Sequence, residues 1–97
     1  MPRIVKQAQA EQDLLDIWLF TFNNWGEEQA DNYLDSLAST LEMLNTQPLV
    51  CRERTEFSPP VRIHHHAHHL IVYLLIEDGI NIIRVLHEKM DINTQLE

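Results

Sequence analysis

The chain has 97 residues, 44% of them apolar and 23% charged, which is the size and composition of one ordinary globular domain. Fifteen acidic against seven basic residues leave a formal charge of −8, a sign that repels phosphate backbones and anionic lipid surfaces. The single cysteine, Cys51, excludes an intramolecular disulfide and a cysteine-based zinc site. The chain shows neither a signal-peptide pattern nor a spanning apolar segment. We therefore expect one cytoplasmic domain, residues 1–97, without direct nucleic-acid or membrane binding.

The first part of the chain predicts a short strand and a broad apolar helix. Residues 3–7 form an extended segment, a helical pattern begins near residues 8–11, and Gly26 fits the end of the helix. Its apolar residues are Leu14, Leu15, Ile17, Trp18, Leu19, Phe20, Phe22 and Trp25. Such a wide apolar surface predicts burial on two sides, against a sheet and against another helix. We interpret both tryptophans as core residues, with Trp25 the better candidate for a partly exposed contact.

A second helix is predicted to begin at Glu27, because its charge and that of Glu28 suit the positive end of the helix dipole. It ends in residues 45–48, at Pro48. A single apolar stripe along it comprises Ala30, Tyr33, Leu34, Leu37, Leu41 and Leu44. Since only a few residues separate the two helices, they should pack as an antiparallel hairpin.

The second half of the chain predicts three strands. After an irregular segment, 49–60, Val61–His64 indicates a strand, and residues 64–69 a histidine-rich connection. Two apolar, β-branched runs at 70–76 and 80–86 flank an Asp-Gly turn typical of a hairpin, where glycine tolerates a positive φ. Residues 92–97 extend the last strand or fray. The order β-α-α-β-β-β predicts an α+β fold: a mainly antiparallel, twisted sheet covered by an N-terminal helical hairpin.

Five of the six histidines lie in residues 64–69. In an extended segment His64, His66 and His68 would share one face, and imidazole is the commonest transition-metal ligand. No carboxylate or thiolate at close spacing completes a site, however, and a bend would break the alternation. We therefore interpret the segment as a solvated connection and expect no metal and no cofactor.

The sequence offers little for catalysis. It has no serine elbow, no HExxH motif and no glycine-rich phosphate loop, and Cys51 has no fixed base nearby. Metal-free RNA cleavage is the better enzymatic candidate, because Arg62, Arg84, His87 and Lys89 could supply a base, an acid and a cation. Arg84, inside an apolar strand, has two interpretations. It contacts a partner or phosphate, or its stem packs on the sheet while its guanidinium pairs with a carboxylate.

Short phrases spread over all these elements combine into one pattern. They are AxxDLxxI at 10–17, WGxxQAxxYxxxL at 25–37, VR at 61–62, HLIVY at 69–73 and IIRVLHxxMD at 82–91. Together they resemble the ParE family of toxin–antitoxin toxins, within the RelE/ParE superfamily, over nearly the whole chain. The last phrase in combination with the second is quite specific.

The resemblance implies a bacterial toxin that arrests growth by inhibiting DNA gyrase through protein–protein interaction, without enzymatic activity. It also implies neutralisation by a ParD-like antitoxin, in a hetero-oligomer of the kind that stabilises plasmids. We expect the target contact at Arg84, His87, Lys89, Met90 and Asp91. We expect the antitoxin contact at Trp25, Arg62 and Tyr73. The competing interpretation of the first set is that Arg84 and Asp91 pair to close the hairpin.

Two alternatives stay open. RelE relatives cut mRNA on the ribosome with basic and aromatic residues, including a tyrosine near the C-terminus. This chain has no tyrosine after Tyr73, and its negative charge suits the ribosome poorly. A degraded toxin that only binds its antitoxin is the other alternative, because the chain departs from the family pattern. Lys89 stands where arginine is usual, Leu49 and Val50 replace a common glycine, and the chain is unusually acidic and rich in histidine.

Overall fold

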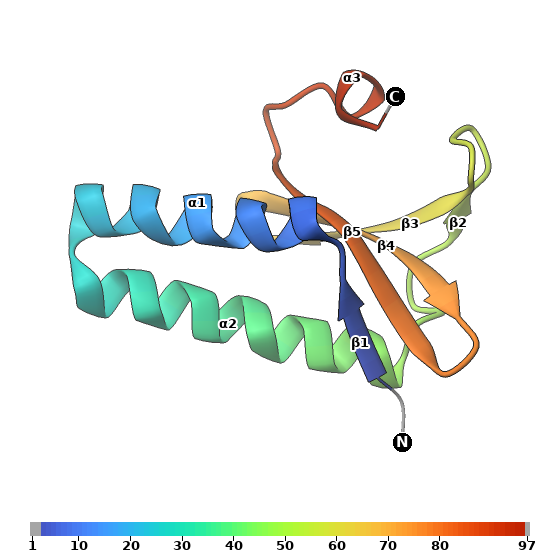
Figure 1. Ribbon diagram of the computed structural model, residues 1–97, viewed down its shortest axis with the longest axis horizontal. Coiled ribbons are helices and arrows are strands. Elements are labelled where there is room, and N and C mark those ends of the chain that lie inside the picture. The colour runs from blue at the N-terminus through green and yellow to red at the C-terminus, as the bar shows by residue number, and fades with distance from the viewer. Residues whose placement is uncertain (1–2, 97) are drawn as a thin grey trace.

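A helical hairpin packs on one face of a five-stranded sheet in the computed structural model, which describes residues 3–96 (Figure 1). The elements are β1 (Arg3–Lys6), α1 (Ala8–Trp25), α2 (Glu27–Thr46), β2 (Glu53–Arg54), β3 (Val61–His66), β4 (His69–Ile76), β5 (Gly79–His87) and α3 (Ile92–Gln95). The strand order is β1-β5-β4-β3-β2, with β1 parallel to β5 and the other pairs antiparallel. The predicted fold class is confirmed; β2 and α3 were not predicted.

Both faces of the central strands are covered, which explains their nearly continuous apolar runs. On one face, Leu37, Leu41 and Leu44 of α2 pack with buried residues of β4 and β5, as the predicted stripe requires. On the other face, a smaller cluster is built on Val61, Val72 and Leu86. Phe57, Ile63, Leu74, Ile83, Ile92 and Leu96 pack against this smaller cluster. The second face is therefore covered by the β2–β3 loop and α3.

The first helix packs against both the sheet and α2, as predicted, but a further side of its wide apolar surface stays exposed, which was not predicted. Its buried residues are Ala10, Asp13, Ile17 and Thr21, which form a narrow stripe toward the sheet and α2. Its exposed large apolar residues are Leu15, Leu19, Phe20, Phe22 and Trp25. Within the described chain, no element covers this further side of α1.

The C-terminal segment, predicted over 92–97, neither extends β5 nor frays as far as residue 96, and residue 97 lies outside the described residues. It turns away after His87 and forms α3, which Asp91 caps. The Asp91 carboxylate accepts hydrogen bonds from the Asn93 N–H and the Thr94 hydroxyl, each at 3.0 Å. The interpretation that Arg84 and Asp91 pair to close the hairpin is therefore wrong, because Asp91 is engaged at the helix start. No helix within residues 3–96 has the length and apolar character needed to cross a membrane.

Candidate interaction site

A groove of about 910 Å³ runs along α1, past the start of α2, to the turn where β5 ends. Phe20 and Trp25 form its apolar wall on α1, and Tyr33 and His69 lie deeper, on α2 and β4. Residues 87–90, from the last residue of β5 through the turn after it, form the opposite wall. The groove thus brings together four of the predicted site residues: Trp25, His87, Lys89 and Met90. Arg62, Tyr73, Arg84 and Asp91 are not among the residues that line it.

Arg84 is held by Asp13 of α1, behind the wall of the groove. Arg84 Nε donates to Asp13 Oδ2 at 2.7 Å and Nη2 donates to Oδ1 at 3.0 Å, a bidentate pair. Asp13 Oδ2 also accepts the Val85 N–H at 2.9 Å. The two side chains are only 15% and 10% exposed, and the hydrogen bond to Asp13 raises the pKa of Arg84. Of the two interpretations of Arg84, the geometry favours pairing with a carboxylate, and the partner is Asp13.

A β-bulge in β5 lies next to Arg84 and helps direct its side chain toward Asp13. Val72 of β4 lies opposite Arg84, while the next residue, Tyr73, lies opposite Ile82, so Ile83 is an extra residue in β5. A bulge bends the strand and redirects the side chains beside it. The parallel pairing of β1 also ends at Lys6 and Ile82, which leaves the following edge of β5 without a strand. Asp13 covers that edge by accepting the Val85 N–H.

Arg62 and Tyr73 belong to the sheet and the loop that follows α2. Arg62 donates to the Cys51 carbonyl. Tyr73 is fully buried, its hydroxyl donates to the Pro48 carbonyl at 2.8 Å, and burial raises its pKa. Tyr73 therefore has no surface for a partner in this fold, and its predicted antitoxin contact does not fit its position. The buried hydroxyl instead fixes the chain after α2.

The prediction of a solvated histidine connection is also wrong. Residues 64–66 extend β3 and His69 begins β4, so that Ala67 and His68 alone form the turn. The two ring nitrogens of His66 lie 3.0 Å from Ser36 Oγ and 2.9 Å from Thr40 Oγ1. Burial lowers the pKa of His66, so both hydroxyls face a neutral ring. The spacing of Tyr33, Ser36 and Thr40, at i, i+3 and i+7, places three hydroxyls on one side of α2 and is the sequence signal for this packing.

His69 and Tyr33 form the deepest polar contact of the groove. The Tyr33 hydroxyl lies 2.6 Å from His69 Nδ1, and the rings of His69 and His87 are 5.5 Å apart. Burial, together with the charge of His87, lowers the pKa of His69 to about 4. Burial also raises the pKa of Tyr33. Both groups are therefore neutral at pH 7, and a hydrogen bond joins the Tyr33 hydroxyl to an uncharged imidazole ring.

Glu88 holds the opposite wall of the groove, residues 87–90, in place. Its two carboxylate oxygens lie 3.0 Å from His65 Nε2 and 3.0 Å from His68 Nδ1. The Glu88 N–H donates to the His68 carbonyl at 2.9 Å, and the hydrogen bond with His68 lowers the pKa of Glu88. The turn after β5 is thereby tied to the β3–β4 turn. Within residues 3–96, no group of three or more His, Cys, Asp or Glu side chains has a geometry that could hold a metal ion.

The partly buried His69 predicts a loss of stability in weak acid. The pKa of His69 is about 4 in the folded protein against 6.5 in the unfolded chain, so the unfolded chain binds more protons between these values. The free energy of unfolding should therefore fall as the pH falls from 6.5 to 4, by roughly 2–3 kcal/mol. Urea unfolding at pH 7 and pH 4 measures the difference. His69→Gln should remove most of it, and an equal pH dependence in that variant would contradict the assignment.

Comparison with known proteins finds a matching family model, related sequences and a chain of similar fold. Residues 4–92 match the family model described as the ParE toxin of the type II toxin–antitoxin system parDE. Toxin ParE1 of Mycobacterium tuberculosis is 30% identical over 97% of each chain, and Toxin ParE1 of Caulobacter vibrioides is 32% identical over 97% of this chain and 95% of its own. A chain of the chromosomal ParDE system from P. aeruginosa has the same fold, with a TM-score of 0.73 at 18% identity, over 90% of this chain and 96% of its own.

Proposed function

Because the chain belongs to the ParE family of toxins from type II toxin–antitoxin systems, we propose that it inhibits DNA gyrase by protein–protein contact in the cytoplasm. We propose further that a cognate ParD-like antitoxin holds it inactive. The observation that carries the proposal is the family match over residues 4–92. The two most specific phrases, at 25–37 and 82–91, both contribute residues to the groove.

The geometry supports a binding function over RNA cleavage. Metal-free cleavage requires a base, an acid and a cation around one phosphate. Arg84 is bound by Asp13, and Arg62 of β3 donates to the Cys51 carbonyl in the loop between α2 and β2. Only His87 and Lys89 of the four candidate residues line the groove. The four side chains therefore do not surround one phosphate position.

We assign the gyrase contact to Lys89 and Met90. Both are exposed, and Met90 shows 47% of its surface. The backbone beneath them is fixed, because the Met90 N–H donates to the His87 carbonyl at 2.9 Å and the Lys89 N–H donates to His87 Nδ1 at 3.1 Å. His87 and Asp91 then hold the turn, and Arg84 supports β5 from behind. A short, fixed turn with one cation and one apolar side chain suits a protein target.

We assign the antitoxin contact to the groove itself. Phe20 and Trp25 expose 62% and 65% of their surface along its α1 wall, and Met90 stands on the opposite wall. An amphipathic helix buries such a surface by the helix-in-groove mode. Since Met90 belongs to both proposed surfaces, a bound antitoxin would exclude gyrase by direct competition.

A supercoiling assay tests the proposal. The purified chain should inhibit gyrase supercoiling, and Lys89→Ala/Met90→Ala should raise the concentration for half-inhibition about tenfold, the effect of removing an interface anchor. Both side chains are exposed, so the thermal midpoint should not change. Arg52→Ala/Leu49→Ala, at exposed positions that do not line the groove, is the matched control and should inhibit like the parent chain.

The same experiment separates the alternatives. Unchanged supercoiling at a large molar excess of the chain would contradict gyrase inhibition. mRNA fragments that appear on induction would support ribosome-dependent cleavage instead. A degraded toxin would bind its antitoxin tightly and leave induced cells growing.

A further inference from the structure

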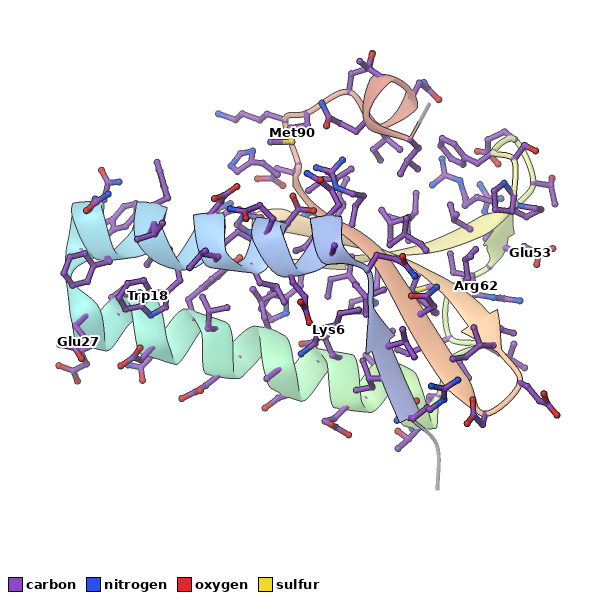
Figure 2. All side chains as sticks on the ribbon, viewed as in Figure 1. Lys6, Trp18, Glu27, Glu53, Arg62 and Met90 are labelled. Carbon is purple, nitrogen blue, oxygen red and sulfur yellow. The ribbon has the colours of Figure 1, made fainter. Side chains whose placement is uncertain are left out.

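The helical hairpin carries the whole net charge of the chain. α1 has three acidic residues and α2 has five, and neither helix has a lysine or arginine. The rest of the sequence holds seven acidic and seven basic residues, which cancel. Asp13 is buried against Arg84, and the other seven carboxylates of the hairpin are exposed. Figure 2 shows oxygen-tipped side chains projecting from the outward side of α2.

The same hairpin leaves an apolar ridge uncovered. Leu15, Leu19 and Phe22 follow i, i+4 and i+7 spacing on α1 and expose 52%, 43% and 42% of their surface. Phe20 borders the ridge and also lines the groove. Removing such side chains from water under a partner stabilises the complex. The ridge and the groove therefore form one surface around α1 that gains from a covering partner.

Carboxylates lie on both sides of this ridge. Asp16 follows Leu15 directly, precedes Leu19 by three residues, and lines the groove. On the side toward α2, the Trp18 ring stacks on Phe22 at 5.1 Å and its indole N–H donates to Asp31 at 2.9 Å. A helix laid on the ridge would therefore face negative charge along both flanks.

We propose that the segment of the antitoxin that covers α1 is a cationic amphipathic helix, with apolar residues at i, i+3, i+4 and i+7 and lysine or arginine beside them. The inference rests on the proposed antitoxin function and adds the chemistry of the partner. Opposite charge across an interface speeds association and excludes like-charged partners. A second copy of this chain is disfavoured by the same field, because it would bring a second hairpin of the same negative charge against the first.

Two synthetic helices test the surface directly. They are 18-residue peptides with the same leucines and with either lysine or glutamate at the remaining positions. The lysine peptide should bind the chain at least about tenfold more tightly than the glutamate peptide at 50 mM NaCl, and the difference should shrink at 300 mM NaCl. Equal affinities, or tighter binding of the glutamate peptide, would overturn the inference.

Variants of the chain locate the binding. Leu19→Ser should weaken the lysine peptide about tenfold at either salt concentration, because it removes an apolar contact. Asp35 is exposed and lies one helical turn after Asp31 on α2, and the hydrogen bond from Trp18 goes to Asp31, so a substitution of Asp35 leaves it intact. Asp16→Lys/Asp35→Lys should weaken binding of the lysine peptide about tenfold at 50 mM NaCl only. Glu53→Lys/Glu77→Lys makes the same change in net charge at exposed sites outside the hairpin and should change the affinity less than threefold. Equal effects of the two lysine pairs would overturn the assignment to the hairpin.

The cognate antitoxin separates this inference from the proposed function. The dissociation constant of the complex should rise about tenfold between 50 and 300 mM NaCl. A tight complex without salt dependence would overturn the cationic segment and leave antitoxin neutralisation standing. Failure of the two purified proteins to form any complex would overturn both.

Discussion

Replacing Arg84 with alanine should lower the free energy of unfolding by about 3–5 kcal/mol, the cost of leaving a buried charge without its partner. Asp13 would then keep only the Val85 N–H as a hydrogen-bond donor, in a site where its side chain is 10% exposed. Asp13→Ala should lower the free energy of unfolding by a similar amount, because the Arg84 guanidinium and the Val85 N–H both lose their acceptor. Urea unfolding measures both, and the double variant should lose less than the sum of the single variants.

The chain supplies a matched control for this pair. Arg54 and Glu56 form a 2.8 Å ion pair whose side chains are 31% and 49% exposed. Arg54→Ala should therefore cost less than about 1 kcal/mol. A loss below 1 kcal/mol for Arg84→Ala would contradict the structural role of the buried pair.

The pair also bears on the gyrase proposal, because Arg84 was a candidate target contact. In Asp13→Asn/Arg84→Gln the two amides can bond each other, and the amide oxygen introduced at position 13 can still accept the Val85 N–H. If this double variant folds and still inhibits supercoiling, Arg84 serves the fold. If it folds and no longer inhibits, Arg84 touches the target.

Secondary structure was largely predictable where a local pattern decides it. The α2 stripe, the Gly26 break and the two apolar runs of the β4–β5 hairpin are confirmed at nearly their predicted bounds. Patterns of period 3.6 and of continuous apolar sequence report which side chains avoid water. The surplus apolar width of α1 was misinterpreted because a sequence does not distinguish burial inside the chain from burial under a partner.

Side-chain pairings were predicted poorly because they depend on tertiary geometry. Asp13 and Arg84 each stood in a recognised phrase, yet they are 71 residues apart, and the bulge at Ile83 that brings them together has no sequence signal we could identify. The short helix α3 had a usable signal, since Asp91 precedes Asn93 and Thr94 as a capping residue. The packing of the partly buried His66 and His69 on α2 also had a sequence signal, the spacing of the three hydroxyl residues Tyr33, Ser36 and Thr40.

Gly79→Ala should unfold the β1 edge of the sheet and lower the free energy of unfolding by about 3 kcal/mol, as overpacking against fixed backbone does. Gly79 does not adopt the left-handed conformation for which its turn position was predicted to require glycine. A Cβ at this position would instead lie 1.8 Å from the Arg3 carbonyl oxygen, and this backbone atom cannot yield as a flexible side chain would. Glycine is required because β1 approaches β5 too closely for a side chain.

The other glycine of the chain, Gly26, is required for its backbone conformation and not for lack of space. Gly26, between α1 and α2, has φ +92°, and a Cβ there would meet nothing within 4 Å. Gly26→Ala should therefore cost only backbone strain, about 1–3 kcal/mol, and leave β1 in place. Amide hydrogen exchange distinguishes the two variants. Gly79→Ala should expose the Arg3 and Gln7 amides, which bond the Asp78 and Ile82 carbonyls at 2.8 and 3.0 Å, whereas Gly26→Ala should leave both protected. Protected β1 amides in Gly79→Ala would show that the strand accommodates a methyl group, and that glycine is there for another reason.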